Sequence, residues 1–332
     1  MGETVTPEPA PSGTAVPGRS GPARQGRLFL LVAAALLLGA LGLTLSLVVP
    51  GVLAGARWPD RAPAAAILLW QAITLAAVLS ALGVVLAAPE ELTRAAGSGR
   101  PVAAAALIGA LAVAAVIVCR LLISLYGVTR RSRARRDRHR LLVDLLDRAE
   151  HREALDVGHL RVLEGSLPLA YCVPGRAARV VLSDGVLKVL DPAQVGAVVA
   201  HEQAHLRQRH EVVMESFTAF YRAVPGPLRS RRPLDAVHQL LEMVADDAAS
   251  RRSGPAPLVA ALERLTDAIP LAEDVRPDGD ERRRRMARMV APQPPARGLT
   301  AVVVLAALAL LVLPTVILVV PWLDHALDAW PL

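Results

Sequence analysis

The chain has 332 residues, of which 53% are hydrophobic and only 3% aromatic, and its formal net charge is +7. With a mean hydropathy of +0.41, it is too apolar for an ordinary soluble protein, and membrane-spanning segments account for the excess. The two cysteines, Cys119 and Cys172, lack CxxC spacing, so the sequence predicts neither a disulfide framework nor a structural zinc cluster.

The N-terminal part combines a polar tail with an apolar stretch. Residues 1–26 are rich in Pro, Gly and Thr, and we expect a disordered tail there. Leu28 to Val49 follows with 22 uncharged residues, enough to cross a bilayer of about 30 Å. A cleaved signal peptide is the alternative, because arginines precede the stretch and an A-x-A sequence begins at Ala54. Since the stretch is longer than a usual signal core, we expect an uncleaved span.

Three further apolar stretches have the length of a span: Ala62 to Ala88, Val102 to Val128 and Thr300 to Val320. A buried helix of a soluble protein would explain one such stretch, but hardly four. We therefore predict a multi-span α-helical membrane protein, with three transmembrane helices in residues 27–128, a fourth in residues 299–323 and a short tail in residues 324–332.

Arginines at both edges of the hydrophilic region predict its orientation. Residues 130–140 hold seven arginines and residues 282–288 hold five. A basic patch for nucleic acid is the alternative, but the position beside the spans favours contact with the lipid bilayer, and no direct nucleic-acid binding is expected. The positive-inside rule places residues 129–298 in the cytoplasm and both termini outside, against a weak opposite pull from the N-terminal arginines.

A hairpin and a helix are predicted in the middle of this region. Pro168 to Val173 and Ala178 to Ser183 are short apolar runs joined by a Pro-Gly turn. Asp191, Pro192 and Gln194 then predict the start of a helix with a capping box.

That helix carries the HExxH motif His201-Glu202-Gln203-Ala204-His205. Histidines four residues apart on a helix project from one face, so His201 and His205 can reach the same Zn²⁺ ion. Glu202, between them, can hold a metal-bound water molecule. The motif therefore predicts a zinc peptidase site.

A catalytic zinc needs a third protein ligand, and Glu242 is the candidate. It lies in a segment that predicts a helix ending near Gly254, and apolar residues flank it, so an unpaired carboxylate there would be costly to bury. Asp246, one turn on, is placed to orient a ligand histidine through its free ring N–H. The alternative is that both are solvated acidic residues on a helix surface.

HExxH followed by Glu-x-x-Ala-Asp resembles the gluzincin arrangement of integral-membrane metallopeptidases, and the sequence between residues 160 and 253 is close to the BlaR/MecR-type family. The resemblance implies an inserted α+β gluzincin-like zinc metallopeptidase domain in residues 129–298. It implies one catalytic Zn²⁺ held by His201, His205 and Glu242, with Glu202 as the general base. Many relatives carry an aspartate five residues after the second histidine; this chain has His210, so the resemblance assigns that position no role.

The function that this resemblance implies is regulatory proteolysis. The expected activity is that of a zinc metalloendopeptidase acting on a cytoplasmic or membrane-associated protein, such as a winged-helix transcriptional repressor. Two alternatives stay open: a quality-control or processing protease of the HtpX or CAAX-prenyl type, which shares both motifs, and a catalytically silent signalling protein.

The hairpin suggests how a peptide would be held. We hypothesise that its second strand is an exposed edge beside the zinc helix, where an extended peptide can add as a further strand. A proline at Val181 would then impair cleavage and leave the zinc content unchanged.

Overall fold

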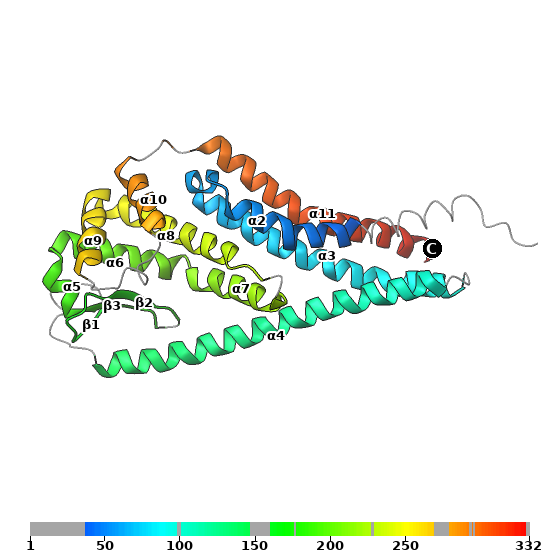
Figure 1. Ribbon diagram of the computed structural model, residues 1–332, viewed down its shortest axis with the longest axis horizontal. Coiled ribbons are helices and arrows are strands. Elements are labelled where there is room, and N and C mark those ends of the chain that lie inside the picture. The colour runs from blue at the N-terminus through cyan, green and yellow to red at the C-terminus, as the bar shows by residue number, and fades with distance from the viewer. Residues whose placement is uncertain are drawn as a thin grey trace, which may run out of the picture.

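The computed structural model describes residues 37–97, 101–146, 160–175, 177–226, 229–268, 279–291, 294 and 296–329. The predicted disordered tail of residues 1–26 and the beginning of the first predicted span lie outside these residues. The molecule is elongated, with long helices at one end and a small sheet with short helices at the other (Figure 1).

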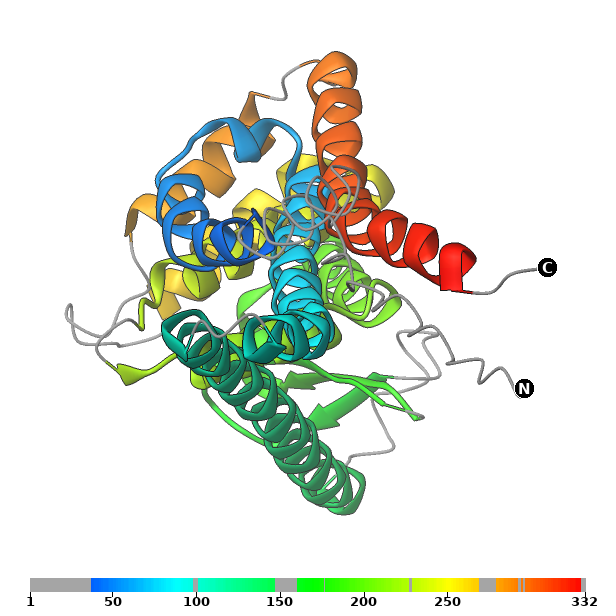
Figure 2. The same ribbon diagram turned by 90° about the vertical axis from the view of Figure 1, so that its right-hand side faces the viewer.

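Four stretches are long and apolar enough to cross a membrane by length and composition: Leu37–Ala54, Pro63–Val84, Leu111–Val143 and Arg297–Ile317. They correspond to the four predicted spans. The first consists of helical residues 37–43, the π-helix η1 (Thr44–Val48) and α2 (Val49–Ala54). The others lie in α3 (Pro63–Gly97), α4 (Pro101–Leu146) and α11 (Arg297–Ala329). A short 3₁₀ helix, η2 (Trp58–Arg61), joins α2 to α3. In the end-on view, α3 lies between α4 and α11 (Figure 2).

Helix α4 continues far beyond its apolar part. Its 46 residues form one helix that includes the arginine-rich segment and reaches the sheet at the other end of the molecule (Figure 1). Arg120, in the middle of the apolar stretch, donates from Nε to the Ala223 carbonyl oxygen at 2.9 Å. Ser124 donates to the Ala219 carbonyl at 2.8 Å. Ala223 is the last residue of α7 (His210–Ala223), so its carbonyl has no donor within the helix, and Ala219 lies one turn before it.

The sheet has three strands in the order β1-β3-β2: β1 (Leu160–Leu163), β2 (Ala170–Val173) and β3 (Arg179–Ser183). The predicted hairpin is present, because β2 pairs antiparallel with β3, Val173 opposite Arg179. The prediction that its second strand is an exposed edge is wrong. Strand β1 pairs in parallel with the other side of β3, which makes β3 central, and Val181 is only 1% exposed. The edge strand of the hairpin is β2.

Helix α6 (Pro192–Arg207) begins as the sequence predicts. The Asp191 side chain accepts from the Gln194 backbone N–H at 2.9 Å, and the Gln194 side-chain oxygen accepts from the Asp191 N–H at 3.2 Å. This reciprocal pair satisfies donors that the first turn leaves free. Val195, Val198 and Val199 of α6 pack in one apolar cluster with residues of β1, β3 and α5 (Asp184–Val189), which fixes the helix against the sheet side of the molecule.

Three more helices complete the end of the molecule that carries the sheet: α8 (Arg232–Ser253), α9 (Pro255–Ala268) and α10 (Gly279–Val290). Helix α8 ends at Gly254, which has a positive φ of 77°, as the sequence predicts. One face of α8 belongs to the core of the long helices, where Leu240 and Met243 share a cluster with Trp70 of α3 and Phe217 of α7. The rings of Trp70 and Phe217 meet edge to face at 6.2 Å.

Candidate metal centre

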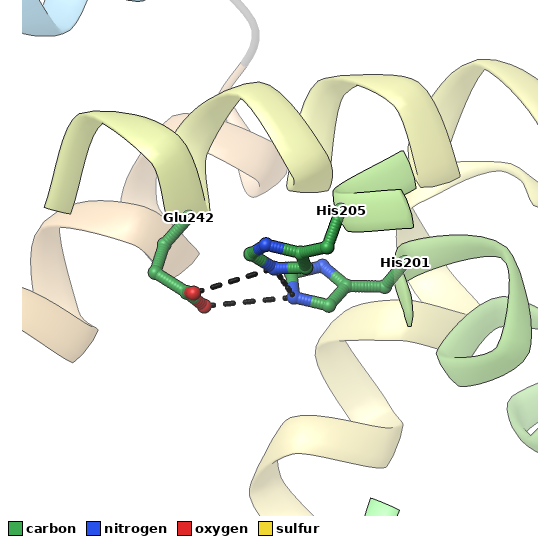
Figure 3. Close-up of side chains that lie close together, drawn as sticks. All are labelled: His201, His205 and Glu242. Carbon is green, nitrogen blue, oxygen red and sulfur yellow. Dashed lines mark hydrogen bonds and ion pairs between the residues drawn. The ribbon is translucent and has the colours of Figure 1, made fainter. Parts of the chain in front are cut away.

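Helices α6 and α8 bring His201, His205 and Glu242 together (Figure 3). His201 Nε2 lies 3.1 Å from His205 Nε2 and 3.5 Å from Glu242 Oε2, and His205 Nε2 lies 3.3 Å from Glu242 Oε1. The two histidines share a face because they are four residues apart on one helix. The Glu242 carboxylate, from α8, closes the triangle although Glu242 follows His205 by 37 residues in the sequence.

The triangle has the dimensions that a zinc ion requires. Ligand atoms about 2.0–2.1 Å from a tetrahedral zinc lie about 3.3–3.4 Å from one another. The measured separations, 3.1–3.5 Å, agree with that spacing. Two imidazole nitrogens and one carboxylate oxygen are also a donor set that catalytic zinc sites use. The three side chains thus fit a zinc ion with one position left for water or substrate.

Asp246 lies behind His201, on the side away from the triangle. Its Oδ1 atom is 3.1 Å from His201 Nδ1, although the approach is too bent for a regular hydrogen bond. Burial would lower the pKa of His201, but the neighbouring carboxylates of Asp246 and Glu242 outweigh this effect and raise it to about 9. In the absence of a metal, His201 is therefore protonated near neutral pH, and a zinc ion would take the place of that proton.

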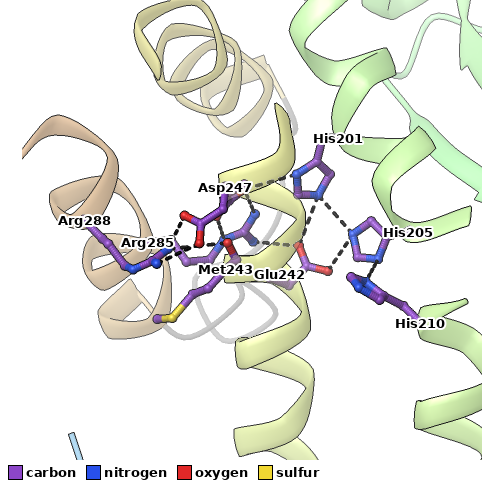
Figure 4. A network of polar contacts seen from close by, with 9 residues as sticks. His201, His205, His210, Glu242, Met243, Asp247, Arg285 and Arg288 are labelled. Carbon is purple, nitrogen blue, oxygen red and sulfur yellow. Dashed lines mark hydrogen bonds and ion pairs between the residues drawn. The ribbon is translucent and has the colours of Figure 1, made fainter. Parts of the chain in front are cut away.

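Arg285 of α10 is a member of this network that the sequence did not indicate (Figure 4). Its guanidinium donates to both oxygens of Asp246 at 2.8 Å, and its Nη1 atom lies 2.9 Å from Glu242 Oε2. Burial would raise the pKa of Glu242 and Asp246, but His201 and Arg285 hold both below their usual values. In the sequence, Arg285 is one of the arginines of residues 282–288, which indicate membrane orientation and no site.

His210, at the start of α7, lies behind His205 (Figure 4). The two Nδ1 atoms are 2.8 Å apart, and His210 Nε2 is 2.9 Å from Gln208 Oε1. Burial lowers the pKa of both His205 and His210 to about 4, so neither ring is charged at neutral pH. The resemblance assigns His210 no role, and its contact with a candidate ligand depends on the turn between α6 and α7.

Glu202 lies in α6 beside the thiol of Cys172 in the edge strand β2. Burial raises the pKa of its carboxyl group, and the nearby positive charge of His201 partly offsets that effect. Burial and the Glu202 carboxylate raise the pKa of the Cys172 thiol to about 12. A carboxyl group with a raised pKa next to the metal ligands has the properties of a group that accepts and returns a proton near neutral pH.

Comparison with known proteins covers one part of the chain. Residues 132–232 match peptidase family M48. No curated protein and no solved structure matches the chain. The matched segment contains His201, Glu202 and His205 and ends where α8 begins, so Glu242 and Asp246 lie beyond it. The match supports a zinc metallopeptidase and leaves the closer BlaR/MecR-type resemblance without confirmation.

Proposed function

We propose that the protein is a membrane-bound zinc-dependent endopeptidase that cleaves a cytoplasmic or membrane-associated protein. The observation that carries this proposal is the triangle of His201, His205 and Glu242, which has the spacing of zinc ligands and lies next to Glu202. The match of residues 132–232 to peptidase family M48 supports the same reaction class.

The roles of the side chains follow from their positions. A zinc ion in this site would polarise the scissile carbonyl group and lower the pKa of a coordinated water molecule. Glu202 takes a proton from the attacking water on its carboxylate and delivers it to the leaving amine nitrogen. Asp246 and Arg285 keep His201 and Glu242 in place.

Strand β2 is the feature that would hold the substrate. It is the edge strand on the hairpin side of the sheet, and its residue Cys172 contacts Glu202. A peptide that adds to this edge as a further strand would pass beside the general base. A substitution that tests this strand addition belongs in β2, since Val181 is a buried residue of the central strand.

The proposed orientation has the peptidase end in the cytoplasm and both termini outside. One contact supports it: Arg284 of α10 lies 4.0 Å from Asp60 in the loop between the first two apolar helices. That loop and the peptidase end are then on the same side of a membrane, as the arrangement of three spans before residue 129 requires. The arginine-rich segments at this side favour the cytoplasm.

The decisive comparison is between the native protein and Glu202→Gln, both purified in detergent and both expressed in cells. We expect both to bind one zinc ion per chain, and the variant to cleave peptide substrates about 10²- to 10⁴-fold more slowly, because the general base is lost. Proteome comparison then names the substrate: a repressor that accumulates only with the variant supports regulatory proteolysis.

Other outcomes of these experiments would assign the protein another function. Accumulation of misfolded membrane proteins would indicate a quality-control or processing protease. Equal proteomes and no peptide cleavage by the native protein would indicate a catalytically silent signalling protein. Absence of zinc from the native protein would contradict the proposal itself.

A further inference from the structure

We propose that His210 and Gln208 together position His205, holding it in the tautomer whose Nε2 atom is free to bind the metal. This inference rests on the proposed zinc site, and it concerns how the chain prepares one ligand. His210 is a positioning residue, since its nitrogen contacts His205 Nδ1, on the ring edge opposite to the atom that faces Glu242.

The contact of His210 with Gln208 and its contact with His205 determine which ring nitrogens carry protons. The Gln208 side-chain oxygen only accepts, so His210 Nε2, 2.9 Å away, donates to it. The two Nδ1 atoms, 2.8 Å apart, share one hydrogen bond, in which one nitrogen donates and the other accepts.

Only one arrangement leaves a metal ligand. If His210 donated through Nδ1 as well, it would be a cation, and neutral His205 would carry its proton on Nε2, where no lone pair would remain for zinc. If His205 donates through Nδ1, then His210 is neutral, and the lone pair of His205 Nε2 faces His201 and Glu242.

The turn between α6 and α7 places His210 in this position. Arg209 adopts the left-handed conformation, with φ 51° and ψ 44°, which ends α6 and starts α7 at His210. A residue other than glycine rarely takes this conformation. The His205 and His210 rings then meet nearly perpendicular, at 88° with centroids 4.7 Å apart.

The two candidate ligands are thus held in different ways. His201 faces the carboxylate of Asp246, whereas His205 faces a neutral imidazole that is itself oriented by an amide. A carboxylate behind a ligand histidine raises its basicity, and a neutral acceptor does so less. We therefore expect an acceptor of either kind at position 210 to support zinc binding, and an apolar residue not to.

The test measures zinc affinity by chelator competition with the full chain in detergent. His210→Leu removes the acceptor at similar size, and its affinity should fall by about 10- to 100-fold. His210→Asp restores an acceptor and should bind zinc at least as tightly as the native protein. Gln208→Met should weaken binding only several-fold, since water can replace an exposed amide. His238→Leu, an exposed change elsewhere on α8, is the matched control and should leave the affinity unchanged.

Each result has one meaning. Equal loss in His210→Leu and His210→Asp, or native affinity in His210→Leu, would overturn the proposal. Nitrogen-15 NMR of histidine-labelled protein should find His205 protonated at Nδ1 and His210 at Nε2, and the reverse pattern for His210 would also refute it. Failure of the native protein to bind zinc would instead refute the proposed function.

Discussion

Arg285 bridges the two carboxylates that α8 holds one turn apart, Glu242 and Asp246. All three groups are largely buried, with side-chain exposures of 15%, 18% and 1%. In the metal-free protein, Arg285 and protonated His201 are the cations that compensate these carboxylates. A zinc ion would add positive charge at the same place, so the need for Arg285 depends on the metal.

We therefore expect Arg285→Gln to destabilise the zinc-free protein by about 3 kcal/mol, because it leaves a buried carboxylate without its partner. The zinc-bound protein should lose less, and zinc should then raise the melting temperature more in the variant than in the native protein. Thermal unfolding with and without a chelator measures both effects. Arg288→Gln is the control: its pair with Asp247 is more exposed, and its loss should cost about 0–1 kcal/mol in either state. An equal zinc-dependent shift in the native protein and Arg285→Gln would contradict this reasoning.

At this scale, sequence reasoning found the residues whose spacing is local or belongs to a motif. Helical spacing predicted that His201 and His205 share one face and Glu242 and Asp246 another, and the need for a third ligand together with the resemblance suggested that the two faces meet; the structure places the four side chains together. Arg285 could not be found in this way, because its contacts depend on how α10 packs against α8. The contribution of each of these residues to zinc binding and to catalysis stays a prediction.

Among the elements, the loop from β1 to β2 is held in place by the end of β3 and the start of α5. Ser183 accepts from the Leu169 N–H at 2.9 Å and donates to the Leu167 carbonyl at 2.6 Å. Gly185 lies directly against this loop, and a Cβ atom there would overlap the Ser166 carbonyl oxygen and come within 2.7 Å of the Leu167 carbonyl carbon. The loop leads into β2, which carries Cys172 beside Glu202.

Gly185→Ala should therefore destabilise the protein by about 1–3 kcal/mol, since backbone atoms must move to make room. It should also lower peptide cleavage, because β2 shifts, while His201 and His205 keep their zinc. The matched control is Gly196→Ala on the exposed side of α6, where a Cβ meets no atom within 4 Å. That change should stabilise the helix by about 0.5–1 kcal/mol. Unfolding temperature and zinc content measure the outcome, and unchanged stability in Gly185→Ala would show that the loop is not held as described.

The elements also divide into those that sequence predicts and those that it does not. The start of α6 was predicted because its capping box lies within four residues, and the end of α8 was predicted because a glycine, Gly254, follows it. The order of the strands was not, because the four residues of β1 pair in parallel with a strand 20 positions later. Pairing between strands so far apart leaves no local pattern in the sequence. Because of this pairing, β3, which we expected at the edge of the sheet, is the central strand.

For the whole molecule, the proposed orientation in a membrane predicts which thiols a charged maleimide can reach in intact cells. Cys119 faces outward from α4 within an apolar stretch, where lipid would cover it, and the raised pKa of Cys172 keeps its thiol protonated. The native protein should therefore label poorly and serve as the blank. Ser98→Cys, between the second and third spans, should label in intact cells, and Arg251→Cys in α8 only after permeabilisation. Labelling in the opposite order would invert the orientation.

Helix α8 presents Glu242 and Asp246 to the metal site, while its other face, with Leu240 and Met243, is packed against Trp70 and its neighbours in the long helices. A fragment that begins near residue 129 would leave that apolar face uncovered, and we expect such a fragment to aggregate. Zinc binding should then depend on the detergent or lipid that surrounds the spans. A detergent that separates α3 from α8 should cause loss of zinc, and a lipid that strengthens their contact should preserve zinc binding.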